Sequence, residues 1–239
     1  MATKKRGQPT VSSNSDSVRQ YMVAAAVTVV TVWLVYRYAA VRYGVEGLST
    51  LNKSLATSTL FLLGIVLLLG PLSRLFTLFD HALKYRKELG VLTFFTGAAH
   101  VYLSMFPLAR RGPLGFYAAQ PLSAYAGLTG FVIMVILFLL SNATIERALG
   151  PKLWWKLQYW GARLAFIAVA FHMIVLKYTG WGAWFADKSS LPPLAILATV
   201  FAAFVLVVRL SELFGPRAAR IVTQLSFLAA TGFTAWLFI

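Results

Sequence analysis

The sequence predicts an all-α membrane protein, a polytopic bundle of transmembrane helices, and three observations lead to this fold class. Of the 239 residues, 59% are hydrophobic and only 12% are charged, whereas soluble globular domains are about 45–50% apolar. The mean hydropathy of the chain is +0.73. Several apolar runs reach the roughly 20 residues that a helix needs to cross a bilayer.

We predict seven membrane spans, preceded by a polar cytoplasmic tail over residues 1–20. The apolar run after the tail is too long for the core of a signal peptide, so we expect it to be retained as the first span. The predicted spans are 21–41, 55–75, 89–107, 122–141, 156–177, 191–210 and 218–239. The linkers carry Gly70-Pro71, Arg110-Arg111-Gly112-Pro113, Gly150-Pro151, Pro192-Pro193 and Gly215-Pro216, which are typical helix breakers.

The basic residues indicate how the helices are oriented. With the N-terminus inside, 14 of the 22 Lys and Arg residues fall on the inner side and 7 on the outer side, and cytoplasmic segments carry such an excess. The aromatic clusters expected at the inner interface are Trp154, Trp155, Tyr159 and Trp160, and those expected at the outer interface are Trp181, Trp184 and Phe185. Topology therefore explains the net charge of +15 better than nucleic-acid binding does.

Three histidines are present and cysteine is absent, so the chain holds no disulfide, thiolate metal site or iron–sulfur cluster of its own. We expect His81, in a basic linker, to be a solvated surface residue. His100 and His172 lie within apolar sequence, and an ionisable residue at such depth indicates a functional site. His100 lies about 18 Å along its helix from Glu88, and His172 lies about 18 Å along its helix from Trp160. The two rings can therefore face each other in the outer half of the membrane. If the fifth span starts at Trp155 instead, His172 lies about 8 Å deeper along its helix than His100 does.

Small and polar residues share the helix faces of both histidines. Thr93, Gly97 and Ser104 lie beside His100, and Gln158, Gly161, Ala165 and Ala168 lie beside His172. Two interpretations remain open on these residues alone. Smooth faces would admit a flat macrocycle, so that His100 and His172 ligate a b-type haem. Small residues also suit close helix packing, with the histidines as hydrogen-bonded core residues.

Four further polar residues lie within a predicted span or close to the end of one. Arg163 lies on the opposite side of its helix from His172, so we expect it to reach the inner interface or pair with another helix. Asn142, Glu146 and Arg147 are expected to form an interfacial cap. A quinone or flavin contact near the inner face, at these residues or at Gln158, stays open.

Three motifs resemble a known family. They are Arg86-Lys87-x-Leu89-Gly90 followed by His100, then Leu128-Thr129-Gly130 through Ser141-Asn142 and Leu149-Gly150, then Trp155-Lys156-Leu157-Gln158 followed by His172. Over roughly residues 55–177 they resemble the ferric-reductase-like transmembrane domain, and within it the haem-binding membrane subunits of bacterial methionine sulfoxide reductase systems.

The resemblance implies a six-helix core, here 21–217, that holds b-type haem and passes electrons across the bacterial inner membrane. The donor would be a cytoplasmic flavin, pyridine nucleotide or quinol, and the acceptor would lie outside. Carried over to this chain, His100 and His172 match the ligands of the outer haem. Residues 218–239 would be an additional transmembrane helix beyond the six-helix core, and whether it is a docking element stays open on the sequence alone.

The chain departs from the family pattern in ways that predict a single haem. Gln158 stands where the family has histidine, the spacing from there to His172 is one residue longer than the pattern, and no second histidine precedes His100 on its span. We also expect the chain to borrow its electron donor, because no flavin or nucleotide domain follows the last span.

The predicted function is therefore an electron-transfer subunit, not catalytic alone, that binds one b-type haem within a larger membrane redox complex. Its partners would be the other subunits, donor and acceptor proteins or quinone, and the lipid bilayer, with no nucleic acid. The alternative is a structural or assembly subunit that keeps the fold without electron transfer. A small-solute transporter is less favoured, because no repeat or pair of broken helices is evident.

Overall fold

A computed structural model describes residues 14–108, 115, 119–188 and 190–239. Among them every regular element is a helix, so the all-α prediction is confirmed. The long helices are α1 (Asn14–Tyr43), α2 (Leu48–Leu75), α3 (Arg86–Met105), α5 (Pro121–Leu140), α7 (Pro151–Lys177), α9 (Leu194–Ser211) and α10 (Pro216–Trp236). The shorter elements are η1 (Thr77–Tyr85), α6 (Ala143–Leu149), η2 (Tyr178–Gly180), α8 (Trp181–Asp187) and η3 (Glu212–Phe214).

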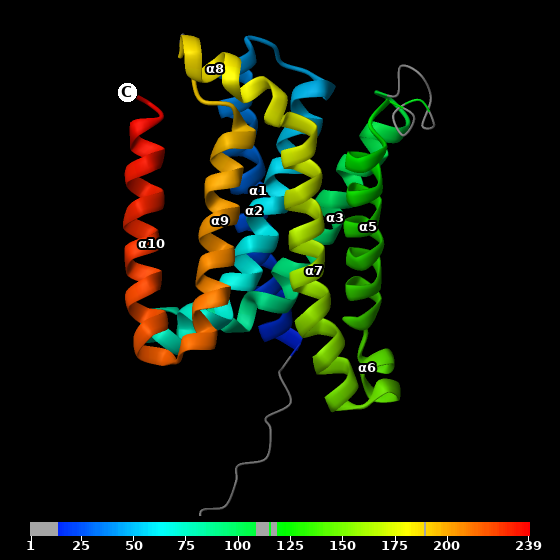
Figure 1. The fold of residues 1–239 in the computed structure, drawn as a ribbon. Coiled ribbons are helices and arrows are strands. Elements are labelled where there is room, and N and C mark those ends of the chain that lie inside the picture. Colours follow the sequence, from blue (N-terminus) through cyan, green and yellow to red (C-terminus); the bar gives the residue numbers. More distant parts are fainter. Residues whose placement is uncertain (1–13, 109–114, 116–118, 189) are drawn as a thin grey trace, which may run out of the picture.

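Five segments of the described chain are long and apolar enough to cross a membrane. They comprise α1, α2, α5, the continuous stretch from α7 through α8, and α9 extended by η3. The chain is therefore an integral membrane protein. Helices α3 and α10 run alongside these segments (Figure 1) but are not among the five, and α3 opens on the charged residues Arg86, Lys87 and Glu88. A six-helix core with a seventh span therefore stays a prediction.

Helix α2 is the central element of the bundle. Two thirds of its most apolar window is buried (67%), and it packs against α1, α3, α7 and α9. The largest core cluster joins Leu67 of α2 to Phe166 of α7 and Val205 of α9, all of which are essentially inaccessible. Helix α10 packs mainly on α9, at the edge of the bundle (Figure 1).

Glycine and proline define most of the helix boundaries, as predicted. Gly150 and Gly215 adopt positive φ values of 74° and 87° immediately before α7 and α10, a backbone conformation that glycine accepts at little cost. Each is followed by a proline in the first turn of the helix, where the missing N–H leaves no hydrogen bond unmade. Pro192-Pro193 likewise precede α9.

Gly70-Pro71 does not form a linker, which corrects our expectation. Both residues lie inside α2, which continues to Leu75. The buried Pro71 side chain packs in the bundle, and this tertiary packing outweighs the single backbone hydrogen bond that proline removes. The predicted linker around Arg110-Arg111-Gly112-Pro113 and most of the polar tail lie outside the described residues.

The two ends of the bundle differ in character. Helix α6 and the start of α1 lie at one end, and α8 and the C-terminus lie at the other (Figure 1). Asn142 caps α6, since its side-chain oxygen accepts a hydrogen bond of 2.8 Å from the Thr144 N–H, which confirms its predicted role as a cap. At the α8 end, Lys188 lies 3.7 Å from the ring centroid of Trp236 and joins α10 to the linker that precedes α9.

Candidate functional site

His100 and His172 come from helices that are not a closely packed pair. Helix α3 packs mainly against α2, and α7 packs mainly against α5. Both histidines are half-buried, and the charge of His172 acts on the ring of His100 across the bundle. His81, in contrast, is exposed in η1.

A side-chain amide of α2 fixes the ring of His100. The Nδ1 atom of His100 lies 2.8 Å from Oδ1 of Asn52, and Nδ2 of Asn52 donates a hydrogen bond of 2.9 Å to Oγ of Ser104. Because the amide nitrogen faces Ser104, the amide oxygen faces the ring and can only accept. Nδ1 of His100 therefore carries the proton, and Nε2 keeps its lone pair.

The backbone of α5 fixes the ring of His172. Its Nδ1 atom donates a hydrogen bond of 2.7 Å to the carbonyl oxygen of Ser123. The hydroxyl of the same serine lies 3.1 Å from Nδ1 and 3.2 Å from the carbonyl oxygen of His172, to which it donates. Since a carbonyl oxygen only accepts, His172 is also in the tautomer that leaves the lone pair on Nε2.

Both rings are thus in the tautomer that can ligate a metal through Nε2. Across the described residues, neither Nε2 atom takes part in a hydrogen bond. A histidine that ligates a metal donates its other ring N–H to a fixed acceptor, which orients the ring and makes it more basic. In the described part of the chain no three residues of the types His, Cys, Asp and Glu gather into a metal site. Two such imidazoles suit an iron whose remaining donors come from a macrocycle.

Gly127 makes room for the His172 ring. A Cβ atom built on Gly127 would lie 2.7 Å from Nδ1 of His172 and 3.0 Å from its Cε1. No larger residue can occupy this position of α5 unless the ring moves.

Replacing Gly127 with alanine is therefore expected to displace the His172 ring and weaken its hydrogen bond to the Ser123 carbonyl. Overpacking of this kind costs about 1–3 kcal/mol, and the loss should appear as a lower thermal midpoint of unfolding in detergent. Gly90→Ala is the matched control, because nothing lies within 4 Å of a Cβ there. Equal midpoints for the two variants would contradict the close fit.

The small residues predicted beside the histidines lie at helix contacts. A Cβ on Gly97 would lie 3.2 Å from Thr59 and from Met134, and one on Gly161 would lie 2.8 Å from Leu137. Ala165 is fully buried in the main core cluster, and Ala168 faces Gly130 of α5. These positions serve close helix packing, and a role in cofactor binding stays a prediction.

The sequence pattern does not single out Asn52, Ser123 or Gly127. Asn52 lies in what we expected to be a linker, because the predicted second span began at residue 55, whereas α2 begins at Leu48. Ser123, Gly127 and Gly130 recur at spacings of four and three along α5, which is the small-residue pattern of a helix interface in membranes. That pattern could have indicated the close contact between α5 and α7.

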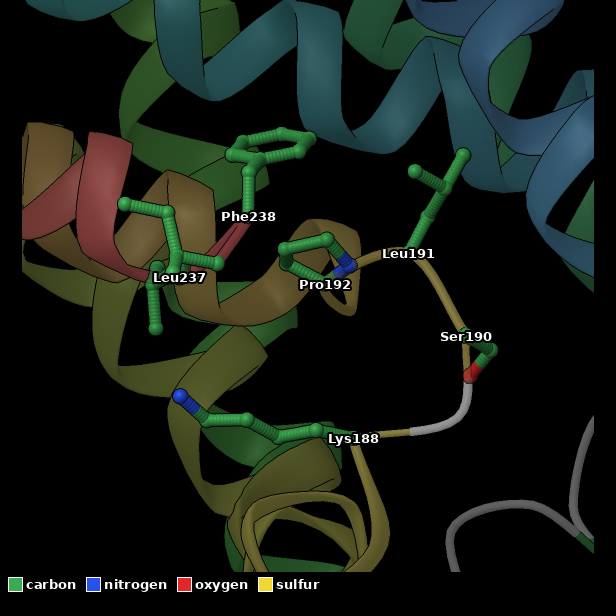
Figure 2. Close-up of a pocket in the computed structure, with 7 residues that line it drawn as sticks. Lys188, Ser190, Leu191, Pro192, Leu237 and Phe238 are labelled. Carbon is green, nitrogen blue, oxygen red and sulfur yellow. The ribbon is translucent and has the colours of Figure 1, made fainter.

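Two pockets lie toward the α8 end. One, of about 220 Å³, is lined by Lys188, Pro192 and the last three residues of the chain, and neither histidine contributes to it (Figure 2). The other, of about 260 Å³, opens where α5 begins and α7 ends, and Ser123 lines it. The hydrogen-bond partner of His172 is therefore also part of a surface pocket.

At the opposite end, Glu212 gathers arginines from three helices. Its carboxylate accepts hydrogen bonds from Arg74 and, at 2.7 Å, from Arg209, and Nη2 of Arg163 lies 3.9 Å away. The expectation that Arg163 pairs with another helix is confirmed. Burial and the neighbouring Arg74 guanidinium lower the pKa of Arg86 below its ordinary value.

Phenylalanines of α3 and α5 stack on one another between the two helices. The ring of Phe94 stacks on Phe138 with centroids 4.4 Å apart and on Phe131 at 6.2 Å. Gln158 is half-buried nearby on α7 and donates a hydrogen bond of 3.3 Å to the carbonyl oxygen of Leu137.

Parts of the chain are similar to known membrane proteins. Residues 54–169 match the family described as "Ferric reductase like transmembrane component". The chain is also 31% identical over 137 residues to the protein-methionine-sulfoxide reductase heme-binding subunit MsrQ of Ralstonia nicotianae. That match covers 56% of this chain and 60% of the relative.

The matched segment runs from α2 into α7 and includes His100, although His172 lies just beyond the match to the family. Both comparisons thus confirm the resemblance that the motifs predict: residues 54–169 of this integral membrane protein match the ferric-reductase-like transmembrane family.

Proposed function

We propose that this chain is a transmembrane electron-transfer subunit that binds one b-type haem through Nε2 of His100 and Nε2 of His172. The observation that carries the proposal is the matched state of the two rings. Each donates its Nδ1 proton to a fixed acceptor at 2.7–2.8 Å and keeps the Nε2 lone pair free for a metal.

The similarity to the relative also supports haem as the bound cofactor. The Ralstonia protein is named as the heme-binding subunit of a reductase. The chain covers only 60% of that protein. We infer that the chain likewise works with other subunits of a membrane redox complex.

The chain's own residues would hold and insulate the site. Asn52 and Ser123 orient the two imidazoles, and the surrounding apolar helices exclude water. Lys53 and Lys177 lie close enough to interact electrostatically at the α8 end, where their charges would complement the carboxylates of a macrocycle. When bound, a haem supplies the reversible one-electron chemistry of its iron, whose potential depends on ligands and burial.

The inner half of the site supports a single haem. Position 158 offers an amide, whose nitrogen is already bonded to the Leu137 carbonyl. The stacked rings of Phe94, Phe131 and Phe138 occupy the adjoining space between α3 and α5. A quinone or flavin at the inner face would deliver electrons across this packed layer.

The proposal is tested by a dithionite-reduced-minus-oxidised absorption spectrum of the purified chain in detergent, with haem quantified per chain. We expect the sharp bands of a low-spin b-type haem at a ratio near one. Well-folded protein without haem would contradict the proposal and favour a structural or assembly subunit.

The proposed orientation places the N-terminus in the cytoplasm of a bacterial inner membrane. It can be tested directly, because the chain has no cysteine and single cysteines report accessibility without background. Leu78 of η1 is 82% exposed and Ala186 of α8 is exposed at the opposite end. An impermeant maleimide added outside intact cells should label Ala186→Cys and leave Leu78→Cys unlabelled; the reverse pattern would invert the topology.

A further inference from the structure

We propose that Asn52 is a positioning residue that sets the redox potential of the haem iron through the ring of His100. The inference rests on the proposed ligation of the haem by His100. Asn52 lies two residues before the segment that matches the family.

The side chain of Asn52 connects two residues of α3 through hydrogen bonds. His100 and Ser104 are one turn apart on the same helix face, and the amide of Asn52 from α2 contacts both, at 2.8 Å and 2.9 Å. Ser104 holds the amide nitrogen, so the amide oxygen is held toward Nδ1 of the ring. The half-buried amide thereby has both of its functional groups engaged.

The two proposed ligands donate to different kinds of hydrogen-bond acceptor. The acceptor for His172 is the backbone carbonyl of Ser123, which no side-chain substitution removes. The acceptor for His100 is a side chain. A substitution at Asn52 would therefore change the hydrogen bonding of one proposed ligand without replacing that ligand.

The direction of the effect follows from the chemistry of imidazole. An acceptor at Nδ1–H increases electron density on Nε2 and makes the ligand more basic. A more basic ligand stabilises ferric iron over ferrous iron and lowers the potential. Losing the acceptor should raise the potential, and a charged acceptor should lower it.

The experiment compares the midpoint potentials of Asn52→Leu and Asn52→Asp with that of the unaltered full chain, by spectroelectrochemical titration in detergent. Leucine has nearly the shape of asparagine but accepts no hydrogen bond, and we expect a rise of about 59 mV, equivalent to about tenfold in the ferric-to-ferrous ratio. Aspartate keeps an acceptor and should shift the potential the opposite way. A general disturbance of packing would not produce shifts of opposite sign.

Ser226→Ala is the control. Ser226 lies on α10, and its hydroxyl donates a hydrogen bond of 3.0 Å to the carbonyl oxygen of Thr223 in the same helix. Its removal touches neither histidine, so the potential should stay at the value of the unaltered chain.

Haem retained at an unchanged potential in both Asn52 variants would overturn the role of Asn52 and leave ligation by His100 intact. If Asn52→Leu fails to hold haem, the aspartate variant decides, and an unchanged or raised potential there overturns the proposal. A haem spectrum that survives His100→Ala would instead overturn the proposed function.

Discussion

Replacing His100 or His172 with alanine is expected to abolish the haem spectrum of the purified protein. Under the proposed ligation, each variant would remove one of the two Nε2 donors and leave a single protein ligand for the iron, so the low-spin bands should vanish and haem per chain should fall at least tenfold. The measurement is the reduced-minus-oxidised spectrum together with a pyridine-haemochrome assay.

His81→Ala is the control for this pair, because His81 is exposed in η1 and has no proposed role. Added imidazole should restore part of the low-spin spectrum in an alanine variant that still folds, since it supplies the missing donor. Unchanged spectra in both variants would show that neither residue ligates the iron.

Glu212→Gln is expected to cause the largest loss of stability among the charge substitutions. The Glu212 side chain is only 20% exposed and accepts from Arg209, whose side chain is 8% exposed, at 2.7 Å. Among the described residues, neutralising the carboxylate removes the acidic partner of the largely buried guanidiniums of Arg163 and Arg209. Breaking a buried pair in this way costs about 3–5 kcal/mol, measured as a lower thermal midpoint in detergent.

Glu46→Gln provides a matched comparison at the surface. The pair between Arg37 and Glu46, at 3.2 Å, has side chains that are 56% and 65% exposed. Such exposed pairs contribute about 0–1 kcal/mol, so this variant should unfold close to the unaltered chain. Equal losses for the two glutamates would show that the cluster around Glu212 is not a structural support.

Much of the fold could be predicted because hydropathy and helix-breaking residues are local properties. Five of the seven predicted spans correspond to segments long and apolar enough to cross a membrane. The starts of α7 and α10 coincide with Gly150-Pro151 and Gly215-Pro216. Gly70-Pro71 was misjudged because tertiary packing of α2 overrides the local tendency of proline to end a helix.

The sequence indicates the two histidines of the candidate site but not their hydrogen-bond partners. His100 and His172 stood out because ionisable residues are rare in apolar runs. Their hydrogen-bond partners did not, since Asn52 and Ser123 are ordinary polar residues near helix ends, 48 and 49 positions away from the rings they contact. The small residues predicted beside the histidines were recognised by their spacing, yet spacing does not say which neighbouring helix they face.

The sequence by itself thus determined the class of protein, the helices and the two histidines, because each depends on the chemistry of contiguous residues. The tertiary structure alone decided the tautomers of the two rings, the room that Gly127 leaves for His172, and the pairing of Glu212 with arginines as distant as Arg74, 138 positions away. These features depend on which helix faces meet, and helix packing is set by the whole bundle rather than by any one segment.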